Sequence, residues 1–276
     1  MTITELKYSN TNTYLIEGDK GTILFDTGWA GTFAAFCREL GEKHKALQDI
    51  DYLLISHFHP DHMGIAGEIA ECGPKVLIMD LQLPYIHSSD AIFGKENNRF
   101  FKPISENDLK VVSVDESRAF LTSIGINGEI IYTPGHSDDS ISLYLDDGSL
   151  FVGDLNPLYE LDMHKGTDIE KSWNNLLSRN PSRIYYGHAK TAIFEENDMP
   201  VETQKNDESS LDGLGYKLVS RVIKYIDKGY NVDKIRKKTG VDQEIIEDIN
   251  RMYLTHPGVS IQGILDRIEI KNGGRK

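Results

Sequence analysis

The chain has 276 residues, of which 39% are hydrophobic and 26% charged, as in a globular protein with a sizeable core. It has no run near the roughly 18 consecutive apolar residues of a membrane span, and Met1 to Glu5 lack the features of a signal peptide, so we expect a cytoplasmic protein without membrane contact. The net charge is −13 and is unevenly distributed. Residues 211–276 contain 13 Lys and Arg and 9 Asp and Glu, whereas the rest of the chain contains 17 Lys and Arg and 34 Asp and Glu. An acidic surface of this kind disfavours nucleic acid as a partner.

The first 80 residues alternate between strand and helix patterns. Apolar stretches at 12–17 and 22–25 flank a turn with two glycines and predict a hairpin. The segments expected after this hairpin are a helix at 31–49, a strand at 52–55, a helix at 65–72 and a strand at 75–80. This order predicts a layered α/β body. Cys37 and Cys72 lie inside helical segments, so we expect two reduced, buried thiols.

The strand at 52–55 leads into the motif His-x-His-x-Asp-His at 57–62. His57 and His59 are two residues apart, so on an extended backbone they point to the same side. Asp61 and His62 follow where the chain turns, and can face a second, neighbouring position. Imidazoles and a carboxylate without thiolate suit zinc, iron or manganese, so the motif predicts two neighbouring metal ions. Asp26, directly after a strand, either forms a turn or accepts hydrogen bonds from ligand imidazoles.

Residues 81–109 interrupt the alternation of strands and helices. They are rich in aromatic residues and show no clean period, and a long irregular segment in a compact domain is often functional. The segment forms a wall of a substrate pocket, packs over a helix, or contacts another subunit. For the first alternative, the candidate substrate-binding residues are Tyr85, Phe93, Phe100 and Phe101.

Three later strand patterns also end in a histidine or a carboxylate. His136 follows the strand at 129–132 on a Pro-Gly turn, and Asp154 and His188 end the apolar stretches at 149–154 and 183–188. Ligands collect at the ends of strands in α/β sheets, so we expect these three side chains beside the motif at 57–62.

Taken in order, these motifs resemble those of the metallo-β-lactamase superfamily. The resemblance covers about residues 10–195 and is carried by the segments 22–28, 57–62, 133–136, 152–154 and 186–188. It implies an αββα sandwich, with two mixed sheets packed together, helices outside and metals at one edge. By position it implies that Asp26 supports the ligands and that the metals are held by two sets of side chains bridged by Asp154. These are His57, His59 and His136 for the first metal, and Asp61, His62 and His188 for the second.

Two divalent cations about 3.5–4 Å apart lower the pKa of a shared water and create hydroxide at physiological pH. Asp61 would ligate one of them and also pass a proton to the leaving group. The sequence therefore predicts a dinuclear metal hydrolase, with zinc as the first choice and iron or manganese as alternatives. The expected partner is a small acyl substrate, such as a thioester, lactone or ester; the second choice is a small phosphodiester. A metal-binding regulator that acts through C-terminal helices is the alternative from a different class.

The chain is expected to divide into a catalytic domain at 1–200 and a helical region at 211–276, after a polar connector at 195–210. A helix at 216–226 is followed at 232–249 by the outline of a helix-turn-helix, with Gly240 at the bend. Its second helix carries four carboxylates between residues 242 and 248, which disfavours DNA binding. We therefore expect these helices to cap the substrate entrance or to form a homodimer contact.

Overall fold

The computed structural model describes residues 1–95, 98–194, 216–227, 230–255, 261 and 264. The chain divides into two compact units, Met1–Met199 and Pro200–Lys276. The connector expected at 195–210 lies outside the described residues.

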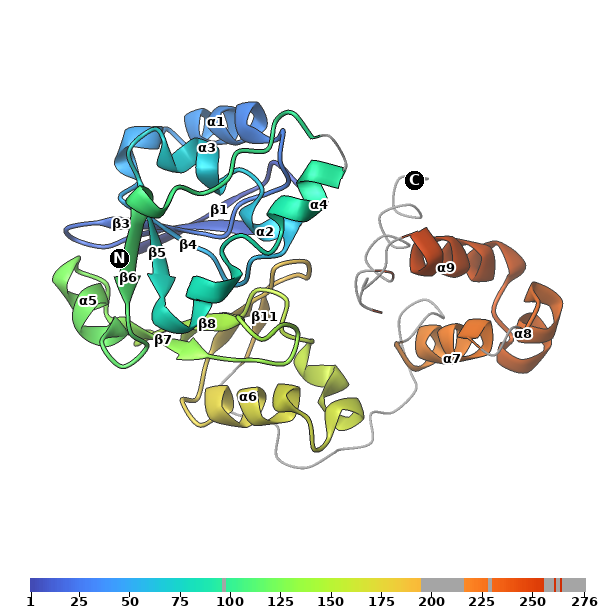
Figure 1. Cartoon of the computed structure of the whole chain (residues 1–276). Coiled ribbons are helices and arrows are strands. Elements are labelled where there is room, and N and C mark those ends of the chain that lie inside the picture. Colours follow the sequence, from blue (N-terminus) through green and yellow to red (C-terminus); the bar gives the residue numbers. More distant parts are fainter. Residues whose placement is uncertain (96–97, 195–215, 228–229, 256–260, 262–263, 265–276) are drawn as a thin grey trace. The chain divides into compact units, whose positions relative to one another are not determined.

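The first unit contains two mixed β-sheets, and the larger one comes from the N-terminal half of that unit (Figure 1). Its strand order is β1-β2-β3-β4-β5-β6. The strands are β1 (Thr2–Leu6), β2 (Thr13–Glu17), β3 (Thr22–Phe25), β4 (Tyr52–Leu54), β5 (Lys75–Met79) and β6 (Leu109–Val112). The pairs β1–β2 and β2–β3 are antiparallel, whereas β3 to β6 run parallel. Parallel neighbours need crossover connections, and these contain the helices of this half.

The second sheet has the order β11-β10-β9-β8-β7. Its strands are β7 (Gly128–Tyr132), β8 (Ile141–Leu145), β9 (Ser149–Phe151), β10 (Arg183–Tyr185) and β11 (Ala192–Ile193). Strand β8 is antiparallel to both β7 and β9, and β10 is parallel to β9 and antiparallel to β11. Strands β7, β9 and β10 therefore point in one direction, and each is followed by one of the candidate ligands.

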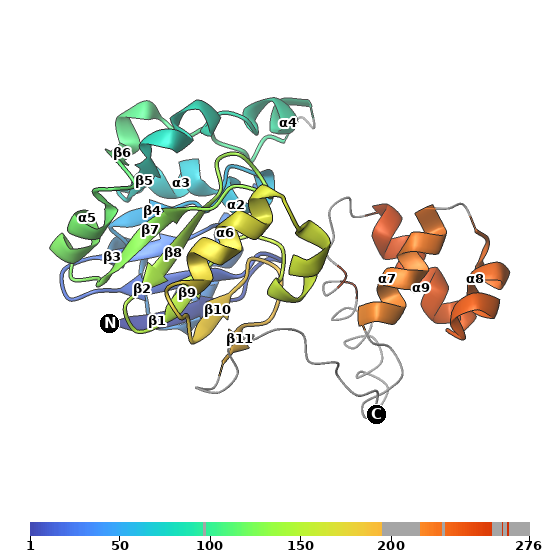
Figure 2. The same cartoon turned by 90° about the horizontal axis from the view of Figure 1, so that it is seen from below.

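Helices cover the outer faces of the two sheets (Figures 1 and 2). The α-helices of the first unit are α1 (Phe33–Glu42), α2 (Pro60–Met63), α3 (Ala66–Ala70), α4 (Asp90–Lys95), α5 (Ser117–Ser123) and α6 (Asp168–Leu177). Short 3₁₀ helices connect them: η1 (Leu47–Asp49), η2 (Asp80–Tyr85), η3 (Glu106–Asp108) and η4 (Leu158–His164). Helices α1 and α3 lie against the first sheet, and α6 lies against the second.

Three buried apolar layers hold this arrangement together. Successive residues of strand β3 contribute to different layers. Leu24 belongs to the same apolar cluster as Phe36 of α1, whereas its neighbours Ile23 and Phe25 pack between the two sheets. A third layer places Trp173 of α6 on the outer face of the second sheet. Both faces of the central strands are thus apolar, which explains their continuous apolar stretches in the sequence. The order helix, sheet, sheet, helix confirms the predicted αββα sandwich.

Some local expectations from the sequence were wrong. The helix expected at 31–49 ends at Glu42, because His44 adopts a positive φ of 57° and the chain resumes as η1. Cys37 and Cys72 are free thiols, as expected, but both are exposed rather than buried. The edge strands β1 and β11 and the helix η4 were not predicted. The formation of these edge strands depends on pairing with β2 and β10 more than on their own composition.

The second unit is helical, as predicted, with a core of its own. Its helices are α7 (Tyr216–Asp227), α8 (Val232–Thr239) and α9 (Gln243–Thr255). Gly240 ends α8 with a φ of 73°, and its N–H donates to the carbonyl of Arg236 at 2.8 Å. The side chains of Glu244 and Asp248, two of the carboxylates that argued against DNA, lie outside the described residues. In the part of the chain that the structure describes, no helix combines the length and apolarity needed to cross a membrane.

Candidate metal centre

Seven candidate ligands from the four loops after β4, β7, β9 and β10 meet at one edge of the sandwich. They form three groups whose ligand atoms lie within 4.8 Å of one another: His57, His59 and His136; His57, His62 and Asp154; and Asp61, His62 and His188. In the first sheet β3 and β4 run parallel, and in the second sheet β7, β9 and β10 point in one direction. The candidate ligands lie in segments that directly follow these strands.

The first group combines one buried and two more accessible imidazoles. His59 Nδ1 lies 3.0 Å from His57 Nε2 and 3.1 Å from His136 Nε2. His57 is 1% exposed, whereas His59 is exposed at the N-cap of α2, where Pro60 starts the helix. Two imidazole nitrogens on one tetrahedral zinc lie about 3.3 Å apart, given Zn–N distances of about 2.0–2.1 Å. The spacing of the three nitrogens therefore fits a shared cation.

The second group is built around a buried histidine. His62 Nε2 lies 3.3 Å from His188 Nε2, and His188 Nε2 lies 3.0 Å from Asp61 Oδ2. The other ring nitrogens are occupied, because His62 Nδ1 donates to Asp26 Oδ2 at 2.8 Å and His188 Nδ1 donates to the Asn10 carbonyl at 2.9 Å. In their neutral forms both imidazoles then present Nε2 lone pairs to each other. A cation between them satisfies both.

Asp154 lies between the two groups. Its Oδ1 is 3.2 Å from His62 Nε2 and 3.4 Å from His188 Nε2, and its Oδ2 is 3.7 Å from His136 Nε2. Oδ1 is also buried and has no hydrogen-bond partner of good geometry among the described residues. A buried carboxylate oxygen without such a partner is costly, and a cation would satisfy it. The donor set of nitrogens and carboxylate oxygens therefore fits divalent metal ions.

The charges of the cluster depend on one another. Burial opposes the charged form of His62, but the carboxylates of Asp154 and Asp26 outweigh it and hold the pKa of His62 well above its ordinary value. Burial alone would raise the pKa of Asp154, yet His62 and His188 hold that pKa well below its usual range. For His57, burial dominates and keeps the pKa well below normal. Since ligands bind metal in deprotonated form, metal would displace the proton of His62.

Asp26 supports the cluster from behind. It is fully buried, with a φ of 60°, and its Oδ1 accepts a hydrogen bond from the Ser56 N–H at 2.6 Å. Its Oδ2 accepts from Ser56 Oγ at 2.8 Å as well as from His62. Ser56 Oγ also lies 3.0 Å from His57 Nδ1. One carboxylate thus orients His62 directly and His57 through Ser56, which fixes which ring nitrogen faces the centre.

Replacement of Asp26 by asparagine is expected to lower the free energy of unfolding of the metal-free protein by about 1–3 kcal/mol. Asparagine tolerates the positive φ, so the backbone stays unstrained, but its amide group turns a donor towards Ser56 and His62. Urea denaturation measures the change. Asp19→Asn, at an exposed turn position, is the control and should change stability by less than about 0.5 kcal/mol. Equal stabilities of the two variants would contradict the role assigned to Asp26.

Two glycines permit the close approach of the loops. A Cβ on Gly187 would lie 2.6 Å from Asp154 Oδ1 and 2.8 Å from His62 Cε1. A Cβ on Gly153 would lie 2.4 Å from Ser56 Oγ, and the φ of Gly153 is 55°. Larger residues at either position would push the ligands apart.

Sequence reasoning did not identify every residue around the cluster. Ser56 ends the apolar run before the motif, and its position there was the only signal in the sequence. Asn10 acts through its backbone carbonyl, which no sequence pattern reveals. Asp139, a buried carboxylate that binds the backbone of Phe58, lies 81 residues from its partner and was likewise missed.

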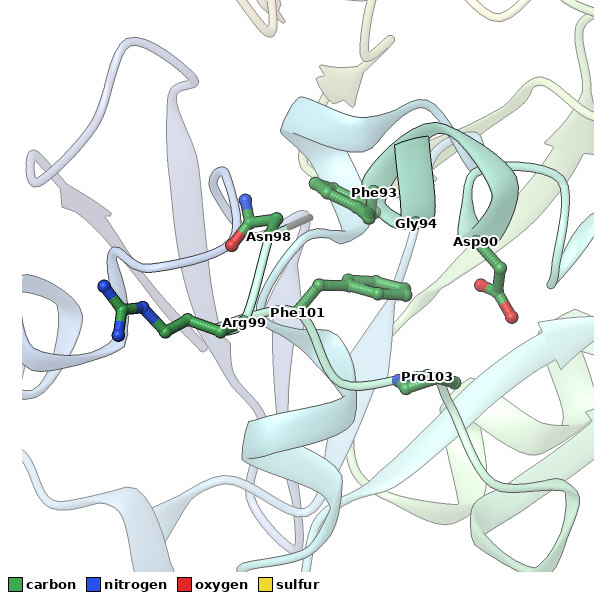
Figure 3. Close-up of a pocket in the computed structure, with 7 residues that line it drawn as sticks. All are labelled: Asp90, Phe93, Gly94, Asn98, Arg99, Phe101 and Pro103. Carbon is green, nitrogen blue, oxygen red and sulfur yellow. The ribbon is translucent and has the colours of Figure 1, made fainter. Parts of the chain in front are cut away.

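The four aromatic residues proposed for substrate binding lie in different environments. Phe93 is buried and stacks on Phe101, with ring centroids 4.1 Å apart, and Tyr85 packs against the same apolar layer. Phe100 is 60% exposed. An open pocket has a volume of about 370 Å³. Its lining residues, drawn in Figure 3, are Asp90, Phe93, Gly94, Asn98, Arg99, Phe101 and Pro103. Contact of these aromatic residues with a substrate stays a prediction.

Comparisons with known proteins agree with this geometry. A family model described as the metallo-beta-lactamase superfamily matches residues 7–188. A beta-lactamase-like protein 2 homolog of Drosophila melanogaster is 29% identical over 195 residues, which are 67% of this chain and 60% of that protein. A probable metallo-hydrolase of Methanocaldococcus jannaschii is 31% identical over 198 residues, which are 66% of this chain and 88% of that protein. The match thus spans less than two thirds of the Drosophila relative.

Solved structures show the same fold. A metallo-beta-lactamase family protein from Thermus thermophilus has a TM-score of 0.51 and 21% identity, covering 72% of this chain and 75% of its own. A second protein, solved in a di-iron-bound form, has a TM-score of 0.52 and 21% identity, covering 70% of this chain and 94% of its own. At these identities the likeness concerns the fold alone.

Proposed function

The chain belongs to the metallo-beta-lactamase superfamily, and from this premise we propose that it is a metal-dependent hydrolase of a small acyl substrate, such as a thioester, lactone or ester. The observation that carries the proposal is the buried Asp154 Oδ1, which has no hydrogen-bond partner of good geometry among the described residues and lies beside the imidazole nitrogens of His62 and His188. Such an arrangement is unfavourable in a purely structural cluster, because a buried carboxylate oxygen without a hydrogen bond of good geometry is costly, and a cation would satisfy it.

The residues suggest two cation sites that share one carboxylate. His57, His59 and His136 would hold the first cation, and Asp61, His62 and His188 the second. Asp154 would bridge them, since its Oδ1 faces the second group and its Oδ2 faces His136. Zinc is the first choice for these nitrogen and oxygen donors, and iron or manganese would also suit them. Bound divalent cations lower the pKa of water towards neutrality and stabilise negative charge on an oxygen of the substrate.

Asp61 is the proposed proton carrier. Its Oδ2 lies 3.0 Å from His188 Nε2, and its side chain is 22% exposed, so solvent and substrate can reach it. Burial would raise the pKa of Asp61, but His188 and His62 lower it, so the carboxylate is ionised at neutral pH and can receive a proton. It would hold the proton of the attacking water at Oδ2 and deliver it to the leaving group.

The chemistry around the cluster favours a small substrate without a long anionic chain. Outside residues 211–276 the chain has twice as many acidic as basic residues. Recognition of a polyanion needs Lys and Arg that neutralise its phosphates, and such a surface disfavours it. A thioester, lactone or ester carries an electrophilic carbonyl and needs no such contacts.

A metal analysis combined with a substrate panel tests the proposal. We expect the purified full chain to contain about two divalent metal ions, and a chelator to abolish its hydrolytic activity until metal is returned. The panel contains a thioester, a lactone, a β-lactam and bis-p-nitrophenyl phosphate. Turnover of the acyl substrates supports the proposal, whereas turnover of the phosphodiester alone replaces it with a phosphodiesterase. A metal-loaded protein that hydrolyses none of them but binds DNA with steep salt dependence would indicate a regulator.

A further inference from the structure

Asp139 is a buried carboxylate that belongs to none of the three candidate ligand groups. It follows His136 by three residues, in the connection from β7 to β8, and is only 4% exposed. Within the described part of the chain, no Lys, Arg or His lies at ion-pair distance from it. Burial of a carboxylate is costly unless its oxygens are hydrogen-bonded, so its partners indicate its role.

The partner of Asp139 is the peptide group between two candidate ligands. Its Oδ2 accepts a hydrogen bond from the backbone N–H of Phe58 at 2.7 Å. The carbonyl of Phe58 accepts from Ser89 Oγ at 2.5 Å. Phe58 separates His57 from His59, so both sides of this residue are held by buried side chains. Rotation of the backbone here would move the two imidazoles apart.

The backbone of Asp139 is held by a buried side chain. Gln82, which is fully buried, donates from Nε2 to the carbonyls of Asp139 at 3.0 Å and Ile55 at 3.1 Å. Its Oε1 accepts from the Met79 N–H at 3.2 Å. The loop with His136 and the loop with His57 and His59 are thus joined through one buried hydrogen-bond network.

We propose that Asp139 is a positioning residue that aligns His57 and His59 with His136 and thereby sets the metal affinity of this first group. The inference rests on the proposed function, because it assumes that the group binds a cation. The second group has supports that do not involve Asp139, namely Asp26 and the Asn10 carbonyl. Loss of Asp139 therefore weakens one metal site and leaves the other nearly unchanged.

The test compares Asp139→Ala with Asp139→Asn in the full chain. Zn²⁺ affinities are measured by competition with a chromophoric chelator, and the visible spectrum of the Co²⁺-loaded protein reports the ligand geometry. In Asp139→Ala we expect one of the two affinities to fall by about 10–100-fold and the spectrum to change. Asp139→Asn keeps a carbonyl acceptor for the Phe58 N–H, so its affinity should return to within about threefold of the wild type. Saturating Zn²⁺ should restore the activity of Asp139→Ala.

Asp138→Ala is the matched control, because it removes an exposed carboxylate from the same loop. Its Zn²⁺ affinities should stay within about twofold of the wild type. If Asp139→Ala does not fold, Asp139→Ser replaces it, since its shorter side chain cannot reach the Phe58 N–H. Folded Ala or Ser variants with both affinities unchanged would overturn this inference and leave the proposed function standing. Wild-type protein that binds no metal would overturn both.

Discussion

His59→Ala is expected to remove one of the two bound metal ions and to lower kcat/KM by at least about 10³-fold, which corresponds to roughly 4 kcal/mol of transition-state stabilisation. His59 Nδ1 faces both His57 Nε2 and His136 Nε2, so no other imidazole of the first group can replace it. Its side chain is exposed at the N-terminus of α2, and its removal leaves no cavity in a core. The fold should therefore persist, with an unchanged far-UV circular dichroism spectrum and a similar midpoint in urea.

His87→Ala is the control for this variant. His87 is also exposed, and its Nδ1 lies 2.9 Å from Asp90 Oδ2, outside the three ligand groups. We expect this variant to keep both metal ions and to retain kcat/KM within about twofold. If His59→Ala kept both metal ions and full activity, the assignment of the first group would be wrong.

Asp154→Asn is expected to have the larger effect, with both metal ions bound weakly and kcat/KM reduced by about 10⁴-fold or more, roughly 5.5 kcal/mol. Asparagine has almost the same shape as aspartate, so the variant tests charge and donor number rather than packing. It removes the negative charge between the two groups and turns an N–H donor towards imidazole nitrogens or a cation. Metal analysis after dialysis, together with kinetics at saturating Zn²⁺, measures the two effects separately.

Asp138→Asn provides the same chemical change at an exposed position and should leave metal content and activity unchanged. The outcome that would contradict the bridging role is an Asp154→Asn protein that loses a single metal ion and retains measurable activity at saturating Zn²⁺. In that case Asp154 would serve only the second group, to which its Oδ1 is closer.

The fold was accessible from the sequence because the strands that hold it together are apolar on both faces. Strand β3 illustrates this, since successive residues pack into different layers and leave a continuous apolar run in the sequence. The helix expected at 31–49 was too long because apolar spacing does not reveal where His44 leaves the helical conformation. The edge strands β1 and β11 were missed, since their structure depends on hydrogen bonds to β2 and β10.

The candidate site likewise contains residues that the sequence revealed and residues that it did not. The motif at 57–62 was recognisable as a candidate metal site, because three imidazoles and a carboxylate within six residues are more polar side chains than a hydrophobic core needs. His136, Asp154 and His188 were recognisable because each comes after a strand that ends at the same edge. Ser56 and Asp139 were not recognisable, since their partners are a buried carboxylate 30 residues away and a peptide group 81 residues away. The metal-ligand roles of all seven residues stay predictions until metal is measured.

The sequence by itself determined the layered α/β architecture and the type of side chain at the centre, because these depend on local apolar periodicity and on ligand residues at strand ends. The order of its motifs also carried the resemblance to the superfamily. Only the tertiary structure decided how the two halves of the site meet. Three features arise between segments far apart in the chain. They are the buried Asp154 oxygen without a hydrogen bond of good geometry, the histidine tautomers set by Asp26 and the Asn10 carbonyl, and the hydrogen bond between Asp139 and the Phe58 N–H. Hydrogen bonds of this kind act over about 3 Å, so a sequence carries no pattern for them until folding brings the loops together.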